Sequence, residues 1–237
     1  MRGMAQFILR VDDCGWVPPD KRNDVRLDYF RSWRDAFGIA GLPVYYGFIP
    51  KTLGVGEIAW LYGELTEEEK VAVHGWDHER GPVSRDKMFL GCDILRAAGV
   101  VDSFEPPYIP PFNAYDEQTL RDWSEAAVSH YGSQTRPIFF GGFPDDPQSL
   151  NPGGEHPCLV EGQMLHLPAF KPLYGRCDEV LARLDEFLHV EHPLVVTLHV
   201  TWDVNHFDSL RPLRDKLAPH LVPASAARDW LRGRDHA

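Results

Sequence analysis

Two histidines, His74 and His78, stand four residues apart directly after the short apolar run 71–73. The run predicts a buried strand that ends just before the first histidine. Because four residues make about one helical turn, a tight turn or a helix start would direct both imidazoles to the same side. Neutral imidazole is the commonest side-chain ligand for divalent transition metals. The pair therefore predicts a metal centre at the end of this strand.

Two adjacent aspartates, Asp12 and Asp13, follow the apolar N-terminal run 6–11 and provide the oxygen ligand that such a centre needs. Asp13 with His74 and His78 would form a site of two histidines and one carboxylate, with open positions for water and substrate. Two adjacent aspartates suggest a division of labour, in which one binds the cation and the other stays unliganded and takes a proton from the bound water. Side chains alternate along a regular strand, so both aspartates reach one site only if the strand turns at this point.

His199 lies near the end of the apolar run 193–200, which predicts the clearest buried strand of the chain. Periodicity and turn residues predict further strands at 43–49, 138–140 and 164–165, and helices at 26–37, 84–98, 116–127 and 178–190, in part of 57–70 and in the tail. Alternating strands and helices predict a parallel sheet, either open or closed into a barrel. Active-site residues of such folds lie at the carboxyl ends of the strands, so the aspartates, the spaced histidines and His199 are expected at one edge.

Length and composition restrict the classes of protein to which the chain can belong. The 237 residues are 43% hydrophobic, carry a formal net charge of -11 and include 4 widely spaced cysteines. This charge argues against nucleic acid as a partner, because nucleic-acid binding needs a basic face. The N-terminus lacks the apolar core of a signal peptide and no apolar run could span a membrane, so we expect a cytoplasmic protein with free thiols. No linker or internal repeat is visible, and a single domain over residues 1–237 is expected.

Taken in order, these motifs resemble those of the polysaccharide deacetylases that carry the NodB homology domain. RVDD at 10–13 is similar to the first motif of that family, T-F-D-D, and HGWDH at 74–78 is similar to the second, H-[ST]-x-x-H. LH at 198–199 is similar to the final motif, and the proline-rich segment 108–120 resembles that of divergent members. The resemblance extends over roughly residues 6–203, and four motifs in the correct order are far more specific than any one of them.

The resemblance implies an α/β fold of the irregular (β/α)7-type barrel kind and a metal-dependent amide hydrolase. Its substrate would be an amino sugar, sugar nucleotide or glycan intermediate that carries an N-acyl group, typically N-acetyl. Asp13, His74 and His78 would bind a divalent metal, with Zn2+ expected and Co2+, Ni2+ or Mn2+ as alternatives. Asp12 would act as the general base, and His199 would act as the general acid that protonates the departing amine.

The sequence departs from the family pattern at three places. Gly75 stands where the second motif usually has Ser or Thr. The arginine of the third motif, which orients the base, is missing, and one alignment puts Glu105 in its place. Arg10 and Arg136 remain as candidates to replace that arginine. The aspartate-tryptophan element of the fourth motif, which tunes the catalytic histidine, has no clear counterpart.

Aromatic residues beside the motifs suit a sugar substrate. Trp16, Trp76, Phe112 and Trp202 lie in or next to the predicted strand-end loops, where a flat ring can cover the apolar face of a pyranose. Asn113 could exchange hydrogen bonds with a hydroxyl or amide of the substrate. Alternatively, the aromatic rings only close the mouth of the barrel, and Asn113 serves as a turn residue.

Two other functions remain open from the sequence. A non-catalytic sugar-binding protein on the same fold would account for the missing arginine. An Fe(II) oxygenase would also use two histidines and one carboxylate, although its usual double-stranded antiparallel sheet does not agree with alternating strands and helices.

Overall fold

The computed structural model describes residues 5–15, 26–38, 41–100, 105–203 and 205–234. Its strands are β1 (Phe7–Cys14), β2 (Val44–Phe48), β3 (Glu69–Val73), β4 (Pro107–Tyr108), β5 (Ile138–Phe140), β6 (Cys158–Val160), β7 (Met164–Leu167), β8 (Ala169–Gly175) and β9 (Leu194–His199). Its α-helices are α1 (Arg26–Phe37), α2 (Pro50–Glu64), α3 (Arg85–Ala97), α4 (Glu117–Tyr131), α5 (Cys177–Arg183), α6 (Phe207–Leu217) and α7 (Ser225–Arg234).

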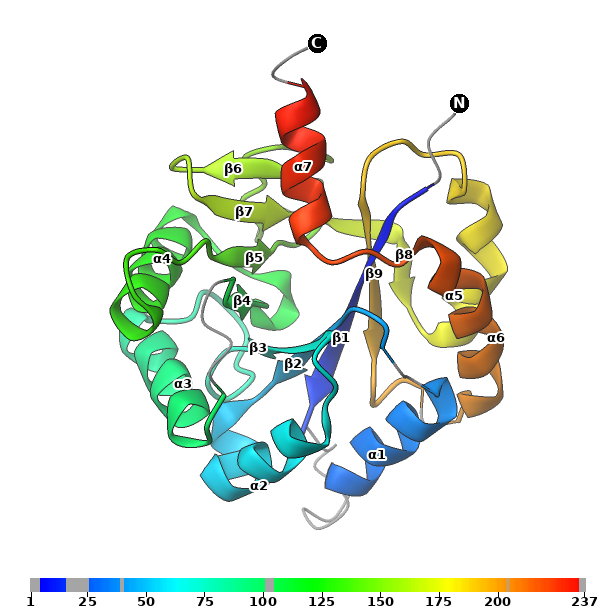
Figure 1. The fold of residues 1–237 in the computed structure, drawn as a ribbon. Coiled ribbons are helices and arrows are strands. Elements are labelled where there is room, and N and C mark those ends of the chain that lie inside the picture. Colours follow the sequence, from blue (N-terminus) through cyan, green and yellow to red (C-terminus); the bar gives the residue numbers. More distant parts are fainter. Residues whose placement is uncertain (1–4, 16–25, 39–40, 101–104, 204, 235–237) are drawn as a thin grey trace.

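The nine strands found in the described residues form one curled sheet in the order β6-β7-β5-β4-β3-β2-β1-β9-β8. Neighbouring strands are parallel, apart from the antiparallel pair of β6 and β7. Figure 1 shows helices α1 to α6 around the outside of the sheet. This arrangement confirms the predicted fold class, an α/β protein whose parallel sheet curls in the manner of an irregular barrel. No helix in the described ranges has both the length and the apolar character needed to cross a membrane.

Alternation along β1 divides its side chains between two hydrophobic clusters. Phe7, Leu9 and Val11 belong to the large cluster that also contains residues of the outer helices. Ile8 belongs to a second cluster, which joins residues from β2, β3, β5, β7 and β9 to Ala227 of α7. Because strands from across the whole sheet meet in it, the second cluster fills the concave side of the curl. Every second residue of β1 therefore points into the barrel.

Four elements differ clearly from what the sequence predicts. Strand β1 continues through the two aspartates to Cys14, and α2 begins at Pro50 rather than near residue 57. Helix α5 ends at Arg183, where the chain continues as a short 3-10 helix, Leu184–Phe187. Strand β8 begins at the end of the segment 129–170, for which the sequence predicts only short strands and long loops, and it continues to Gly175. The extent of a single domain over residues 1–237 stays a prediction.

Candidate metal centre and catalytic pocket

An irregularity at the end of β1 brings both aspartates to one site. The pairing of β1 with β2 shifts register between Val11 and Cys14, and Asp13 has a φ of 63°. Left-handed backbone is uncommon for residues other than glycine and interrupts the alternation of side chains. As a result, Asp12 and Asp13 line the same cavity, and both are buried. This is the turn in the strand that the metal-site prediction requires.

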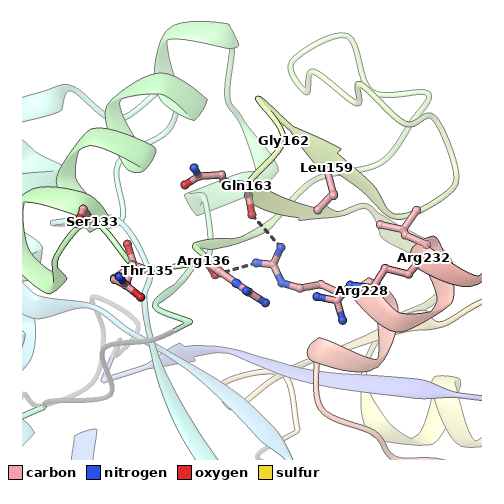
Figure 2. A pocket seen from close by; sticks show the side chains of 10 residues that line it. Ser133, Thr135, Arg136, Leu159, Gly162, Gln163, Arg228 and Arg232 are labelled. Atoms are coloured by element: carbon pink, nitrogen blue, oxygen red, sulfur yellow. Dashed lines mark hydrogen bonds between the residues drawn. The ribbon is translucent and has the colours of Figure 1, made fainter. Parts of the chain in front are cut away.

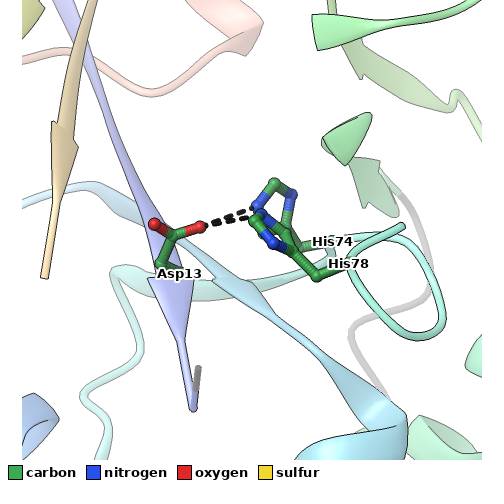
Figure 3. Close-up of side chains that lie close together, drawn as sticks. All are labelled: Asp13, His74 and His78. Carbon is green, nitrogen blue, oxygen red and sulfur yellow. Dashed lines mark hydrogen bonds and ion pairs between the residues drawn. The ribbon is translucent and has the colours of Figure 1, made fainter. Parts of the chain in front are cut away.

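The two histidines come from the loop after β3 and face the carboxylate of Asp13 (Figure 3). The Nε2 atoms of His74 and His78 lie 3.4 Å and 3.0 Å from Asp13 Oδ1. One ligand atom from each of the three residues falls within 4.8 Å of the others. The rings of the two histidines are 4.9 Å apart between centroids, so the loop does direct both imidazoles to one side.

The hydrogen bonds of His74 suit a metal ligand. Its Nδ1 lies 3.0 Å from the carbonyl oxygen of Ile109, which can only accept, so Nδ1 carries the proton. In the neutral ring, Nε2 then presents a lone pair toward Asp13 Oδ1, which also carries lone pairs. Two such atoms attract each other only through a proton or a cation placed between them. The donor set therefore fits a divalent cation, and the carbonyl fixes the tautomer that binds it.

Gly75 is required by the conformation of the histidine loop. It has a φ of 65°, and a Cβ atom at this position would lie 2.4 Å from Cγ of Pro111. The Ser or Thr of the family motif would therefore overlap with this proline. The departure at Gly75 follows from the close approach of the proline-rich segment to the loop.

Arg10 holds the carboxylate of Asp12 in a two-pronged ion pair. Arg10 and Asp12 alternate with Val11 and share the concave side of β1. Nε of Arg10 donates to Asp12 Oδ1 at 2.7 Å, and Nη2 donates to Oδ2 at 2.5 Å. The same guanidinium donates to Asn113 Oδ1 at 3.0 Å and to the Gly141 carbonyl at 3.2 Å. Burial alone would raise the pKa of Asp12, but the charge of Arg10 holds that pKa below its ordinary value.

Arg136, the second candidate for the missing arginine, lies at the other end of the sheet. It precedes β5 and lines a cavity of about 480 Å3 together with Arg228 and Arg232 (Figure 2). Arg228 donates hydrogen bonds to the backbone carbonyls of Gln163, Arg136 and Pro137. Of the two candidates, Arg10 is the one that binds Asp12, the residue predicted to be the base.

His199, the last residue of β9, is buried beside Asp12. Its Nε2 lies 3.1 Å from the hydroxyl oxygen of Tyr174 and 3.8 Å from Asp12 Oδ2. Among the described residues its Nδ1 has no hydrogen-bond partner, and burial lowers the pKa of the imidazole. The indole of Trp202 stacks on the ring with 3.8 Å between centroids and 15° between planes.

These residues enclose a cavity of about 160 Å3. It is lined by Asp12, Asp13, His74, His78, Phe112, Tyr174, His199 and Trp202. The structure thus brings together all five residues predicted for the metal and the chemistry. It adds Tyr174 of β8, which the sequence did not indicate because its strand was not predicted. The signal that could have found Tyr174 is the alternation of buried and exposed residues along a strand that begins near Ala169.

The predicted substrate-binding residues are placed differently from one another. Phe112 and Trp202 line the cavity, with exposed fractions of 44% and 45%. Asn113 is buried, is not among the lining residues and accepts a hydrogen bond from Arg10. Trp76 is not among the lining residues either, and its backbone carbonyl accepts a hydrogen bond from the Lys51 amide. Trp16 lies outside the described residues.

No protein-family model and no curated protein matches the chain by sequence. Solved structures do match it by fold. A protein from Mycobacterium smegmatis assigned as a polysaccharide deacetylase has a TM-score of 0.65 and 14% identity, over 98% of this chain and 91% of its own. A family 4 acetyl xylan esterase from Clostridium thermocellum, in complex with a cobalt ion, has a TM-score of 0.51 and 12% identity, over 94% of this chain and 89% of its own.

A third solved structure is a peptidoglycan N-acetylglucosamine deacetylase in complex with 4-naphthalen-1-yl-N-oxidanyl-benzamide. It has a TM-score of 0.51 and 12% identity, over 94% of this chain and 87% of its own. At identities this low, the structural similarity shows a shared fold and nothing more. The motif resemblance predicts that same fold. The chain therefore has the fold of the polysaccharide deacetylases, with a strongly diverged sequence.

Proposed function

We propose that this protein is a metal-dependent hydrolase that removes an N-acyl group, typically N-acetyl, from an amino sugar, a sugar nucleotide or a glycan intermediate. The observation that carries the proposal is the composition of one cavity. It combines a two-histidine, one-carboxylate cluster with an ionised aspartate and a buried histidine. Hydrolysis of an amide needs a polarised carbonyl, a base for water and an acid for the amine, and the cavity contains a candidate for each task.

Asp13, His74 and His78 would hold the metal. Their donor atoms and the tautomer of His74 fit Zn2+, and the same donors accept Co2+, Ni2+ or Mn2+. When bound, the metal would supply Lewis acidity for the acyl carbonyl and lower the pKa of a water molecule. That the C. thermocellum relative contains cobalt supports a divalent metal on this fold.

Asp12 would take the proton from the attacking water. The ion pair with Arg10 keeps Asp12 ionised in a buried position, so that it is ready to accept that proton. Arg10 also fixes the orientation of the carboxylate by binding both of its oxygens. The base thus keeps the arginine partner that the family motif would supply from another segment.

His199 would provide the proton for the leaving nitrogen. An amine anion is a very poor leaving group, so the C–N bond breaks only as the nitrogen becomes protonated. His199 Nε2 is 3.8 Å from Asp12 Oδ2, and this short distance supports the proposal that both side chains act on one reacting group. The stacked indole of Trp202 holds the imidazole plane in place.

The size and rim of the cavity favour a small acyl group attached to a larger sugar. A volume of about 160 Å3 accommodates an acetamido group but little more. Phe112 and Trp202 would contact the sugar with their exposed rings, and Trp76 and Asn113 are proposed as further contacts or supports. The rim thus suits a pyranose ring that rests outside the buried donors.

A substrate panel tests the proposal. Free, nucleotide-linked and oligomeric N-acetylated sugars would be assayed for acetate release with the metal-loaded protein. We expect Asp12→Asn to retain the metal and lose at least about 100-fold in kcat, because the base is removed and the ligands are kept. We expect His78→Ala to lose the metal while the fold is kept. Full metal occupancy in the His78 variant would refute the ligand assignment, and an unchanged rate in the Asp12 variant would refute the base.

The alternatives lose their main support in this structure. The non-catalytic reading rests on the missing arginine, and Arg10 provides one at the base. The Fe(II) oxygenase reading expects an antiparallel double-stranded sheet, whereas the strands that carry the site are parallel.

A further inference from the structure

The surroundings of His199 leave one route for a proton to leave its ring. Nδ1 is buried and, in the described part of the chain, has no partner. Nε2 lies 3.1 Å from the hydroxyl oxygen of Tyr174, which is nearer than the carboxylate of Asp12 at 3.8 Å. A proton that leaves the imidazole toward the cavity therefore meets the tyrosine first.

Burial raises the pKa of the Tyr174 phenol, and hydrogen bonding with the Asn113 side chain acts in the opposite direction. Oδ1 of Asn113 already accepts from Nη2 of Arg10 at 3.0 Å, so the amide nitrogen is the atom left to donate to Tyr174. A phenol oxygen can accept two hydrogen bonds and donate one. When His199 carries the proton that its proposed role as the acid requires, His199 and Asn113 both donate to this oxygen. The single hydroxyl proton of Tyr174 then points to a third partner.

That third partner is expected in the cavity, because Tyr174 lines it together with the base and the metal cluster. The tyrosine ring is also held in place. It packs edge-on against His199 at 4.9 Å and against Phe143 at 4.8 Å between centroids. The hydroxyl therefore occupies a fixed position between the acid and the space for the substrate.

We propose that the Tyr174 hydroxyl is the group that hands the proton to the leaving amine, and that His199 replaces this proton in the same step. The inference rests on the proposed deacetylase function. As the C–N bond of the tetrahedral adduct breaks, its electron pair stays on nitrogen, which takes the phenolic proton. The phenol oxygen takes the Nε2 proton of His199. His199 enters the step as an imidazolium, with protons on both ring nitrogens, and leaves it as a neutral imidazole that keeps the Nδ1 proton. Tyr174 is a neutral phenol before and after the step, so charge and protons balance.

The environment of Tyr174 disfavours a free tyrosinate. Burial raises the pKa of the phenol, and the charge of Asp12 adds to this effect. Donation by Tyr174 alone would leave an anion beside that carboxylate. Simultaneous transfer from His199 avoids the anion, which is why the two side chains would act as one donor.

The variant Tyr174→Phe removes the hydroxyl and keeps the ring. We expect kcat to fall by about 100-fold while KM changes by no more than about threefold, because the substrate contacts of the ring remain. The rate of the wild type in mixtures of H2O and D2O should curve with the deuterium fraction, since two protons move together. The rate of the variant should depend linearly on that fraction. Tyr108→Phe is the matched control, because its hydroxyl is buried and lacks a partner within the described residues.

A second readout does not depend on turnover. The 15N resonance of His199 Nε2 should shift in Tyr174→Phe, with or without metal, and should stay in place in Tyr108→Phe. An active wild type with an unchanged kcat in Tyr174→Phe, or an Nε2 resonance that does not move, would overturn the relay alone. A wild type that releases no acyl group from any substrate of the panel would instead overturn the proposed function, and the catalytic relay with it.

Discussion

Arg10 is the single residue on which the chemistry of Asp12 depends most. Its guanidinium is 1% exposed and binds both carboxylate oxygens, the side chain of Asn113 and a backbone carbonyl. A buried ion pair contributes little when intact, but leaving one partner alone is costly. Arginine suits this position because its planar fork matches a carboxylate with two parallel hydrogen bonds. The pair therefore sets both the charge and the orientation of the Asp12 carboxylate, the proposed base.

Replacing Arg10 with lysine keeps the charge and removes the fork. We expect Arg10→Lys to lower kcat by about 10-fold or more at unchanged metal occupancy, and to lower the free energy of unfolding by about 3 kcal/mol. Chemical denaturation, metal analysis and acetate release would measure the three quantities. Arg34→Lys is the matched control, because Arg34 holds Glu69 with the same two-pronged geometry, at 2.9 Å and 2.8 Å, away from the cavity. A control that loses as much kcat as Arg10→Lys would contradict the assignment.

At the scale of secondary-structure elements, uninterrupted apolar runs made most of the fold predictable. Helix α1 and strand β9 match their predicted ranges closely, and the strand ends correctly placed Asp12, Asp13, His74 and His199 at one edge. Strand β8 was not predicted because Pro172 interrupts a half-exposed pattern at the edge of the sheet. Because that strand was not predicted, Tyr174 was not identified as a candidate site residue. Arg10 could be named only as an option, since a sequence does not show which side chains share the inside of a curled sheet.

The histidine loop after β3 tests how an element constrains a motif residue. We expect Gly75→Ser, which restores the family's residue, to weaken metal binding and to lower the free energy of unfolding by about 1–3 kcal/mol. The reason is the overlap with Pro111 added to the strain of a left-handed backbone. Gly99→Ser is the control, because Gly99 has a φ of 80° and open space around its would-be Cβ. Calorimetry and metal titration would compare the two. Equal losses would show that the contact with Pro111 has no effect.

In the molecule as a whole, chemistry and structural support occupy opposite ends of the sheet. The candidate metal cluster lies where β1 and β3 end. At the other end, Arg228 of α7 donates to the backbone carbonyls of Gln163 and Arg136, before the starts of β7 and β5 (Figure 2). Arg228 also pairs with Glu105. Helix α7 also contributes Ala227 to the core on the concave side. This division is usual for parallel barrels, in which the carboxyl ends of the strands carry the active site. Substitutions at the α7 end should therefore change stability without changing the pocket.

His166 of β7 also makes the whole fold sensitive to acid, because its buried ring packs against Phe139 and Tyr115 of the large cluster on the helix side of the sheet. Burial lowers the pKa of His166 to about 3 from an ordinary 6.5, and its Nε2 lies 2.7 Å from the Tyr115 hydroxyl. Between these two values the unfolded chain binds a proton at this residue and the folded chain does not, so stability falls as the pH falls. We expect the free energy of unfolding to lose about 2 kcal/mol from this residue between pH 7.5 and pH 5. Denaturation of the wild type and of His166→Gln at several pH values would measure the difference. The difference in free energy of unfolding between the wild type and His166→Gln should change by this amount between pH 7.5 and pH 5. A difference that stays constant over this pH range would contradict the prediction.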